Sequence, residues 1–175
     1  DGMRDRAIRI GSAGKTFSAT GWKVGYITTA APILKMIAKA HQYLVFTTAP
    51  NLQRAVAYGL NQDNAYFEAF EAEMRAKRDR LAKGLEAIGF AVLPCEGTYF
   101  INADIRPLGF EGGDVAFCEY LINEVGVAAI PVSVFYQDGG GDLGSDRRSV
   151  VRFCFAKSDA TLDAALEKMA CHFAK

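Results

Sequence analysis

The stretch from Ile10 to Tyr26 reads IGSAGKTFSATGWKVGY and decides how the first part of the chain folds. The apolar runs Ala7 to Ile10 and Val24 to Thr28 predict two short strands on either side of a connection rich in Gly and Ser. Because an isolated pair of strands is marginal in water, we expect this pair to need a larger sheet that these residues do not supply. The chain begins with Asp1, and we therefore expect it to be a piece of a longer protein.

The connection carries Lys15 among small residues, which allow a bound group to approach the backbone closely. A partly desolvated lysine is a nucleophile toward carbonyl groups. The Lys23 ammonium and the nearby hydroxyls can hold a phosphate dianion, and those hydroxyls are Ser12, Thr16, Ser18 and Thr20. The alternative is a surface loop in which both lysines are merely solvated. A nucleoside-triphosphate loop is excluded, because it needs a glycine five residues before Gly14, where this chain has Arg9.

Helical segments follow these two predicted strands. Pro32 and Pro50 suit the first turns of two helices. Apolar residues at spacings of three, four and seven predict one long helix from Asn64 to about Ile88, with Asn64 as its cap and Gly89 as its stop.

After Gly89 the pattern predicts strands that alternate with helices, which is typical of a small α/β unit. We expect Asp114 to cap the first of these helices, and Ser158 or Asp159 to cap the last. The segment 138–148 is rich in Gly and charge and predicts a mobile loop. The expected strands are 90–93, 98–105, 127–130 and 149–155, and the expected domains are 1–62, a linking helix over 63–89, and 90–175.

Arg152 lies within the apolar strand predicted over 149–155. Alternation places Val151 and Phe153 on one face and Arg152 on the other. A guanidinium in such a strand requires an anion, and its fork of N–H groups matches a carboxylate. That anion is either the α-carboxylate of an amino acid or one of the chain's own 20 acidic residues.

The composition excludes several classes of protein. The 175 residues include 20 basic and 20 acidic side chains, and a net charge of zero argues against nucleic-acid or anionic-membrane binding. No apolar run is long enough to cross a bilayer. The four scattered cysteines indicate reduced thiols in a cytoplasmic protein, and the two histidines are too few and too far apart for a metal cluster.

The segment SAGKTFSATGWKVGY, over 12–26, resembles the active-site lysine motif of pyridoxal-phosphate-dependent class I/II aminotransferases. The resemblance is closest to the kynurenine, glutamine–phenylpyruvate and methionine aminotransferase branch. It continues, in the family's order, through 41–50, 97–100, 126–136 and 151–156. It implies the C-terminal part of an aspartate-aminotransferase-like large domain, followed by a small C-terminal α/β domain.

The same resemblance implies roles for individual residues. Lys15 is the lysine that binds pyridoxal 5'-phosphate covalently, and Ser12 and Lys23 bind its phosphate, although many relatives carry Arg where this chain has Lys23. Arg152 binds the substrate carboxylate. Phe46 is either a substrate contact given by the neighbouring subunit of a homodimer or an ordinary interface or core aromatic. Four further aromatic residues either line the substrate site or pack in the core: Tyr99, Phe100, Phe135 and Tyr136.

The implied reaction is transamination between an amino acid (aromatic, methionine or glutamine-like) and a 2-oxo acid. Two alternatives stay open. The same lysine and arginine would serve a C–S β-lyase. The chain is also expected to hold an incomplete site, because the family's partners for the cofactor ring precede the lysine at positions that this sequence does not include.

Overall fold

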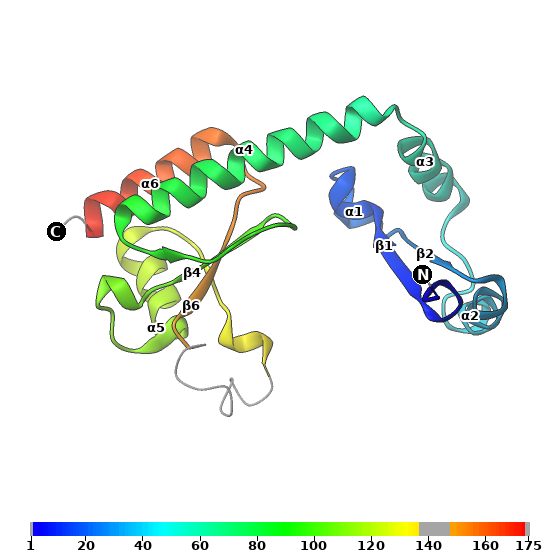
Figure 1. Ribbon diagram of the computed structural model, residues 1–175, viewed down its shortest axis with the longest axis horizontal. Coiled ribbons are helices and arrows are strands. Elements are labelled where there is room, and N and C mark those ends of the chain that lie inside the picture. The colour runs from blue at the N-terminus through cyan, green and yellow to red at the C-terminus, as the bar shows by residue number, and fades with distance from the viewer. Residues whose placement is uncertain (1, 137–147, 174–175) are drawn as a thin grey trace. The chain divides into compact units, whose positions relative to one another are not determined.

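The computed structural model describes residues 2–136 and 148–173. The chain divides into two compact units, Asp1–Tyr66 and Phe67–Lys175 (Figure 1). The division falls inside a long helix, α4 (Asn64–Ile88), whose bounds agree with those that the periodicity predicts. No helix within the described ranges is long and apolar enough to span a membrane.

The first unit is built on an antiparallel hairpin in which Ser12 pairs with Gly25. Gly11 lies under the ring of Tyr26, where an added Cβ would come within 2.3 Å of the ring, so Tyr26 packs on its own hairpin. The elements of the unit are η1 (Arg4–Arg6), β1 (Ile8–Ser12), α1 (Ala13–Thr16), η2 (Thr20–Trp22), β2 (Gly25–Thr29), α2 (Ala31–Leu44) and α3 (Pro50–Leu60).

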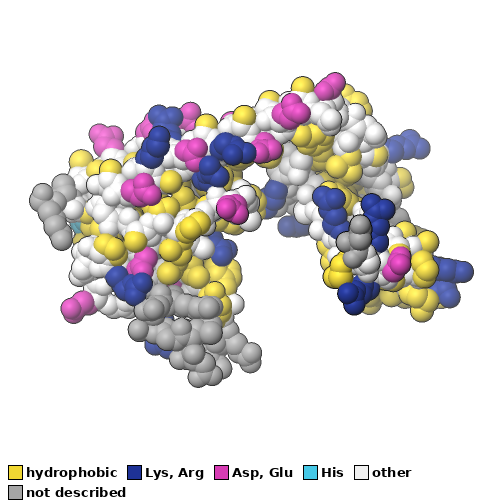
Figure 2. Space-filling model, viewed as in Figure 1, with side chains coloured by type: hydrophobic (Ala, Val, Ile, Leu, Met, Phe, Trp, Pro, Cys, Tyr) yellow, Lys and Arg dark blue, Asp and Glu magenta, His cyan; other side chains and the backbone are white. Residues whose placement is uncertain are grey.

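The core of this first unit is small. Ala13, Val24 and Val56 are its buried apolar residues, with Phe17 and Leu52 packed against them. Helix α2 contains no buried residue, and Figure 2 shows hydrophobic side chains at the surface of this unit. Within the described part of the unit the sheet has two strands, β1 and β2, so the expected larger sheet is not formed by these residues.

The second unit is a four-stranded sheet with helices, in the order β3-β4-β6-β5, and every pair of neighbouring strands is antiparallel. The α/β class predicted from the sequence is confirmed. After α4, its elements are β3 (Ala91–Val92), β4 (Phe100–Asp104), η3 (Arg106–Leu108), α5 (Gly113–Tyr120), η4 (Leu121–Val125), β5 (Ile130–Pro131), η5 (Ser133–Phe135), β6 (Val150–Cys154) and α6 (Asp159–Phe173).

One face of this sheet forms the core. Alternate residues of β4 and β6 point into it, as the period of two predicts, and α4, α5 and α6 each contribute side chains to the same cluster. The buried residues that carry this packing include Leu81, Leu85, Ile101, Ala103, Phe117, Val151, Phe153, Leu162 and Met169. The other face carries Arg152 directly opposite Asn102.

The helix ends show which predicted caps were correct. The Ser158 hydroxyl accepts from the backbone N–H of Thr161 at 3.2 Å, so Ser158 caps α6 as predicted. Gly89 ends α4 with φ +113°, a conformation that favours glycine. Asn64 is not the cap of α4, because the carboxylate of Asp63 accepts from Ala65 N–H at 2.9 Å.

Asp114 is also not a cap. It lies inside the first turn of α5, 2% exposed, and its carboxylate binds Ser133 instead. The predicted strand over 127–130 is shorter than expected, since its ladder includes only Ile130 and Pro131. The segment predicted as a mobile loop lies outside the described residues, apart from Arg148.

Charged side chains lie on the outer surface of α4, where Figure 2 shows acidic and basic groups close together. Arg75 pairs with Glu71 one turn earlier, and Arg80 binds Asp163 of α6 through two hydrogen bonds of 2.7 and 2.9 Å. Exposed pairs of this kind contribute about 0–1 kcal/mol each. The helix is therefore held mainly by Leu81 and Leu85 in the core.

Asp104, at the end of β4, is a buried acid, 6% exposed, whose ionisation stabilises the fold. Burial acts to raise the pKa of its carboxyl, but hydrogen bonds and charge from Arg106 outweigh burial and lower the pKa below the ordinary 3.8. The Arg106 backbone and side-chain N–H groups donate to it at 2.9 and 2.8 Å. A carboxyl with a lowered folded-state pKa stabilises the protein above the unfolded-state pKa and loses that contribution as the pH falls through the folded-state value.

We therefore expect the free energy of unfolding to fall as the pH drops below about 4, and Asp104→Asn to flatten this dependence. Urea unfolding of the chain at a series of pH values measures it. Asp79→Asn is the matched control, because Asp79 forms an exposed pair with Arg78. Identical pH dependence in wild type and Asp104→Asn would contradict the assignment.

Candidate functional site

The lysine hairpin consists of the end of β1, helix α1 and the residues that lead into β2. Ser12 is the N-cap of α1, and its hydroxyl accepts from Gly14 N–H at 3.3 Å. Ala13 N–H donates to Val24 O at 3.0 Å and closes the base of the hairpin. Lys15 therefore lies in the single helical turn that directly follows β1.

Lys23 lies on the other side of the same hairpin end. Its backbone is left-handed, with φ 55° and ψ 41°, and its N–H donates to Thr20 O at 3.4 Å. Because Ser12 pairs with Gly25, two residues after Lys23, the hairpin brings a hydroxyl and two cationic side chains to one end. The structure thus places Ser12, Lys15 and Lys23 on one local scaffold.

Lys15 is exposed within the described chain, which differs from the partly desolvated setting that the sequence predicted. The reason is the small core below it, where Ala13 and Gly14 are buried and the lysine side chain extends beyond them.

Phe46 lies in the loop between α2 and α3 and is 74% exposed. Its backbone is left-handed, with φ 68°, and its N–H donates to His41 O at 3.1 Å. The three residues before it are also exposed and apolar: Tyr43, Leu44 and Val45. Phe46 is therefore not a core aromatic of the described chain.

Arg152 lies on the half-buried face of the second unit's sheet. Its Nε donates to Asn102 Oδ1 at 3.4 Å. The rings of Phe100 and Phe135 lie 5.2 and 4.5 Å from its Cζ, which is the range of cation–π contacts. None of the ion pairs among the described residues involves Arg152, so the internal salt bridge that the sequence left open is not formed there.

The sequence left open which aromatic residues line the substrate site and which pack in the core, and the surroundings of Arg152 distinguish some of them. Phe100 and Phe135 flank the guanidinium, whereas Tyr99 packs against the core. Asn102 was not predicted from the sequence. The alternation of side chains in the strand after Gly97 could have indicated that Asn102 lies on the face opposite to Ile101. Only the strand register, in which Asn102 pairs with Arg152 of β6, places the two residues side by side.

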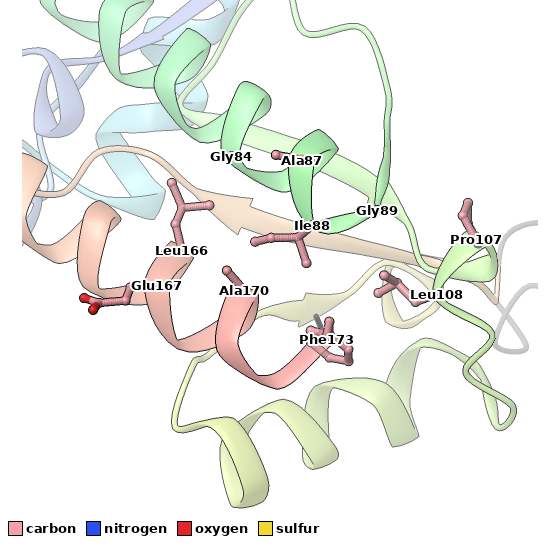
Figure 3. Close-up of a pocket in the computed structure, with 10 residues that line it drawn as sticks. All are labelled: Gly84, Ala87, Ile88, Gly89, Pro107, Leu108, Leu166, Glu167, Ala170 and Phe173. Carbon is pink, nitrogen blue, oxygen red and sulfur yellow. The ribbon is translucent and has the colours of Figure 1, made fainter. Parts of the chain in front are cut away.

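The pocket in Figure 3 is separate from Arg152 and lies within the second unit. It has a volume of about 690 Å³ and lies between α4, α6 and η3. Its lining is mainly apolar, and Glu167 is its only charged lining side chain among the described residues. It therefore offers no cation for a carboxylate or a phosphate.

The four cysteines are free thiols. Cys118 is buried in α5, where burial first and the nearby charge of Asp114 second raise the pKa of its thiol to about 12. A thiol with that pKa is not a nucleophile near neutral pH.

The described residues thus combine an α/β fold with a lysine-bearing hairpin in the first unit and an arginine on the half-buried sheet face of the second. The family model of aminotransferase class I and II matches residues 2–169, and the chain belongs to this family. Pyridoxal phosphate is the cofactor that this family implies.

Individual relatives agree with the family assignment. The chain is 43% identical over 172 residues to a probable N-succinyldiaminopimelate aminotransferase of Mycobacterium tuberculosis, which covers 97% of this chain and 43% of that protein. It is 42% identical to a methionine aminotransferase of Escherichia coli, over 95% of this chain and 42% of the relative. It is 37% identical to the bovine kynurenine–oxoglutarate transaminase 3, over 95% of this chain and 39% of the relative.

Solved structures agree as well. The structure of N-succinyldiaminopimelate aminotransferase from M. tuberculosis matches with a TM-score of 0.87, and it covers 98% of this chain and 43% of that one. An E. coli protein described with a methionine aminotransferase function matches with a TM-score of 0.88 at 41% identity, over 97% of this chain and 43% of that one. The chain thus spans about 43% of the length of these relatives.

Proposed function

We propose that this chain is the C-terminal part of a pyridoxal-phosphate-dependent aminotransferase, with residues 1–62 ending the large domain, 63–89 linking, and 90–175 forming the small domain. The lysine hairpin carries the proposal, because Ser12, Lys15 and Lys23 all lie at one end of it. Family membership and the structural likeness support the same reading.

The residues of the hairpin fit the cofactor by their chemistry. The Lys15 amine is exposed and matches an aldehyde. The Ser12 hydroxyl accepts from Gly14 N–H and still has its own proton to donate to a phosphate oxygen. Lys23 adds a positive charge without the bidentate fork of an arginine.

The bound cofactor supplies an electron sink for the bond that breaks at the substrate α-carbon. Lys15 would hold the cofactor covalently through its Nζ. When that Nζ is not bonded to the cofactor, it would act as the base that accepts the proton of the substrate α-carbon and returns it. Arg152 binds the substrate carboxylate through its N–H groups and so orients the α-carbon toward the lysine.

Phe46 is proposed to contact the substrate bound by a neighbouring copy in a homodimer. Its 74% exposure and the exposed apolar run before it support a role outside the core of its own unit. The proposed substrates are an amino acid of the aromatic, methionine or glutamine-like kind and a 2-oxo acid, and the proposed location is the cytoplasm. The neutral net charge is consistent with small-molecule substrates and not with nucleic acid.

An exchange assay tests this function. The full-length holoenzyme should convert an aromatic amino acid or methionine to its 2-oxo acid only when a 2-oxo acid acceptor is present, with the acceptor aminated in equal amount. A C–S β-lyase would instead release pyruvate and ammonia from a cysteine S-conjugate without an acceptor. Pyruvate release without any amino exchange would contradict the proposal.

A further inference from the structure

Asp114 is a buried acid with an unusual set of partners. It is 2% exposed, and both of its carboxylate oxygens accept hydrogen bonds from one residue, Ser133, at 2.7 Å from N–H and 2.9 Å from Oγ. Its own backbone N–H donates to Arg148 O at 2.6 Å. A buried carboxylate destabilises the fold unless hydrogen bonds compensate its charge. The bonds from Ser133 to the carboxylate are charge-assisted and therefore strong.

Ser133 begins the single turn η5, which follows β5 directly. The residue before it, Val132, donates its N–H to Val150 O at 3.1 Å and so joins the turn to β6. Within the turn, Phe135 N–H donates to Val132 O at 3.1 Å. The backbone of η5 is thus fixed from two sides, by β6 through Val132 and by α5 through Asp114.

This turn presents Phe135 to Arg152, with the ring 4.5 Å from Cζ. The Phe135 side chain is 55% exposed, so packing alone does not hold it in place. Its position over the guanidinium depends on the backbone of the turn.

We infer that Asp114 is a positioning residue for the carboxylate-binding arginine, acting through Ser133 and Phe135. The ring covers one face of the guanidinium and keeps water from it, while the N–H groups at the guanidinium edge stay available to an anion. Charge-assisted hydrogen bonds strengthen when the surroundings are less polar. The inference rests on the proposed function, because it assumes that Arg152 binds the substrate carboxylate.

The test measures binding of 3-phenylpropionate, a carboxylate without an amino group, to the full-length holoenzyme by calorimetry. Phe135→Leu keeps an apolar side chain and removes the aromatic face, and we expect its Kd to rise about threefold to tenfold. Asp114→Asn replaces two charged acceptors by one neutral acceptor and one donor, which weakens the bonds to Ser133, and it should raise the Kd in the same direction. Ser133→Ala, which loses the Oγ bond and keeps the N–H bond, serves the same purpose if Asp114→Asn does not fold.

The double variant separates positioning from a general loss of structure. If Asp114 acts through Phe135, the variant with both changes binds no more than about twofold more weakly than Phe135→Leu alone, because the effects of coupled residues do not add. Additive effects would overturn the inference, and so would an unchanged Kd in Phe135→Leu.

Two controls complete the experiment. Val134→Ala changes an exposed side chain in the same turn, and Leu162→Ala weakens the core of the unit far from the turn in sequence. Neither should alter the Kd in the folded protein, and an equal rise in Leu162→Ala would overturn the inference. A failure of the proposed function is distinguishable, because Arg152→Ala would then leave the Kd unchanged as well.

Discussion

Lys15→Ala is expected to abolish transamination, lowering turnover by at least about a thousandfold, because it removes the amine that is proposed to hold the cofactor covalently and to carry the α-proton. The absorbance band that pyridoxal phosphate gains on binding to the lysine should disappear in the same variant. Turnover and the absorbance spectrum of the full-length protein, each measured with added pyridoxal phosphate, test this expectation.

The matched control is Lys35→Ala, which removes an exposed lysine from α2 of the same unit. It should keep both the band and the turnover of the wild type. Wild-type turnover in Lys15→Ala would refute the assignment of the lysine. A Lys15→Ala protein that retains the absorbance band would show that another amine binds the aldehyde.

Arg152→Ala is expected to weaken amino-acid binding far more than cofactor binding. Loss of a charge-assisted carboxylate pair costs about 2–5 kcal/mol when the pair is desolvated. Because Arg152 is only half-buried in the described chain, we expect the lower end, about a thirtyfold rise in KM for the amino acid. The absorbance of the bound cofactor should not change, since Arg152 belongs to the substrate side of the proposed site.

Arg152→Lys tests whether the geometry of the guanidinium matters as well as its charge, because it keeps the charge and loses the bidentate fork. It should recover only part of the affinity. Arg148→Ala removes an exposed arginine that precedes β6, and it should leave KM unchanged. Unchanged amino-acid kinetics in Arg152→Ala would contradict its role as the carboxylate ligand.

The elements with a strong local pattern could be predicted from the sequence. Helix α4 spans Asn64–Ile88 as its apolar spacing indicates, and β6 alternates as expected, with Val151 and Phe153 buried and Arg152 on the other face. These patterns succeed because a helix or a strand repeats its facing at a fixed period.

Helix caps were harder to predict from the sequence, because a side chain that suits a cap can bind another partner instead. An aspartate just before a helical run usually caps it, yet Asp114 binds Ser133, which is 19 residues away. For α4 the error was local instead, because the adjacent Asp63, and not Asn64, supplies the capping hydrogen bond. Which acceptor reaches an N–H group depends on how elements pack, and periodicity carries no information about that.

The residues themselves predicted the family, which the family model confirms, and they place a lysine, a serine and a second cation at short spacing on one hairpin. Only tertiary packing determined the surroundings of Arg152. Asn102 and Phe100 come from β4 and Phe135 from η5, and only strand register and the buried bonds of Asp114 bring them to one guanidinium. Contacts between segments far apart in the chain are set by the burial of shared apolar surface, which single-segment patterns do not encode.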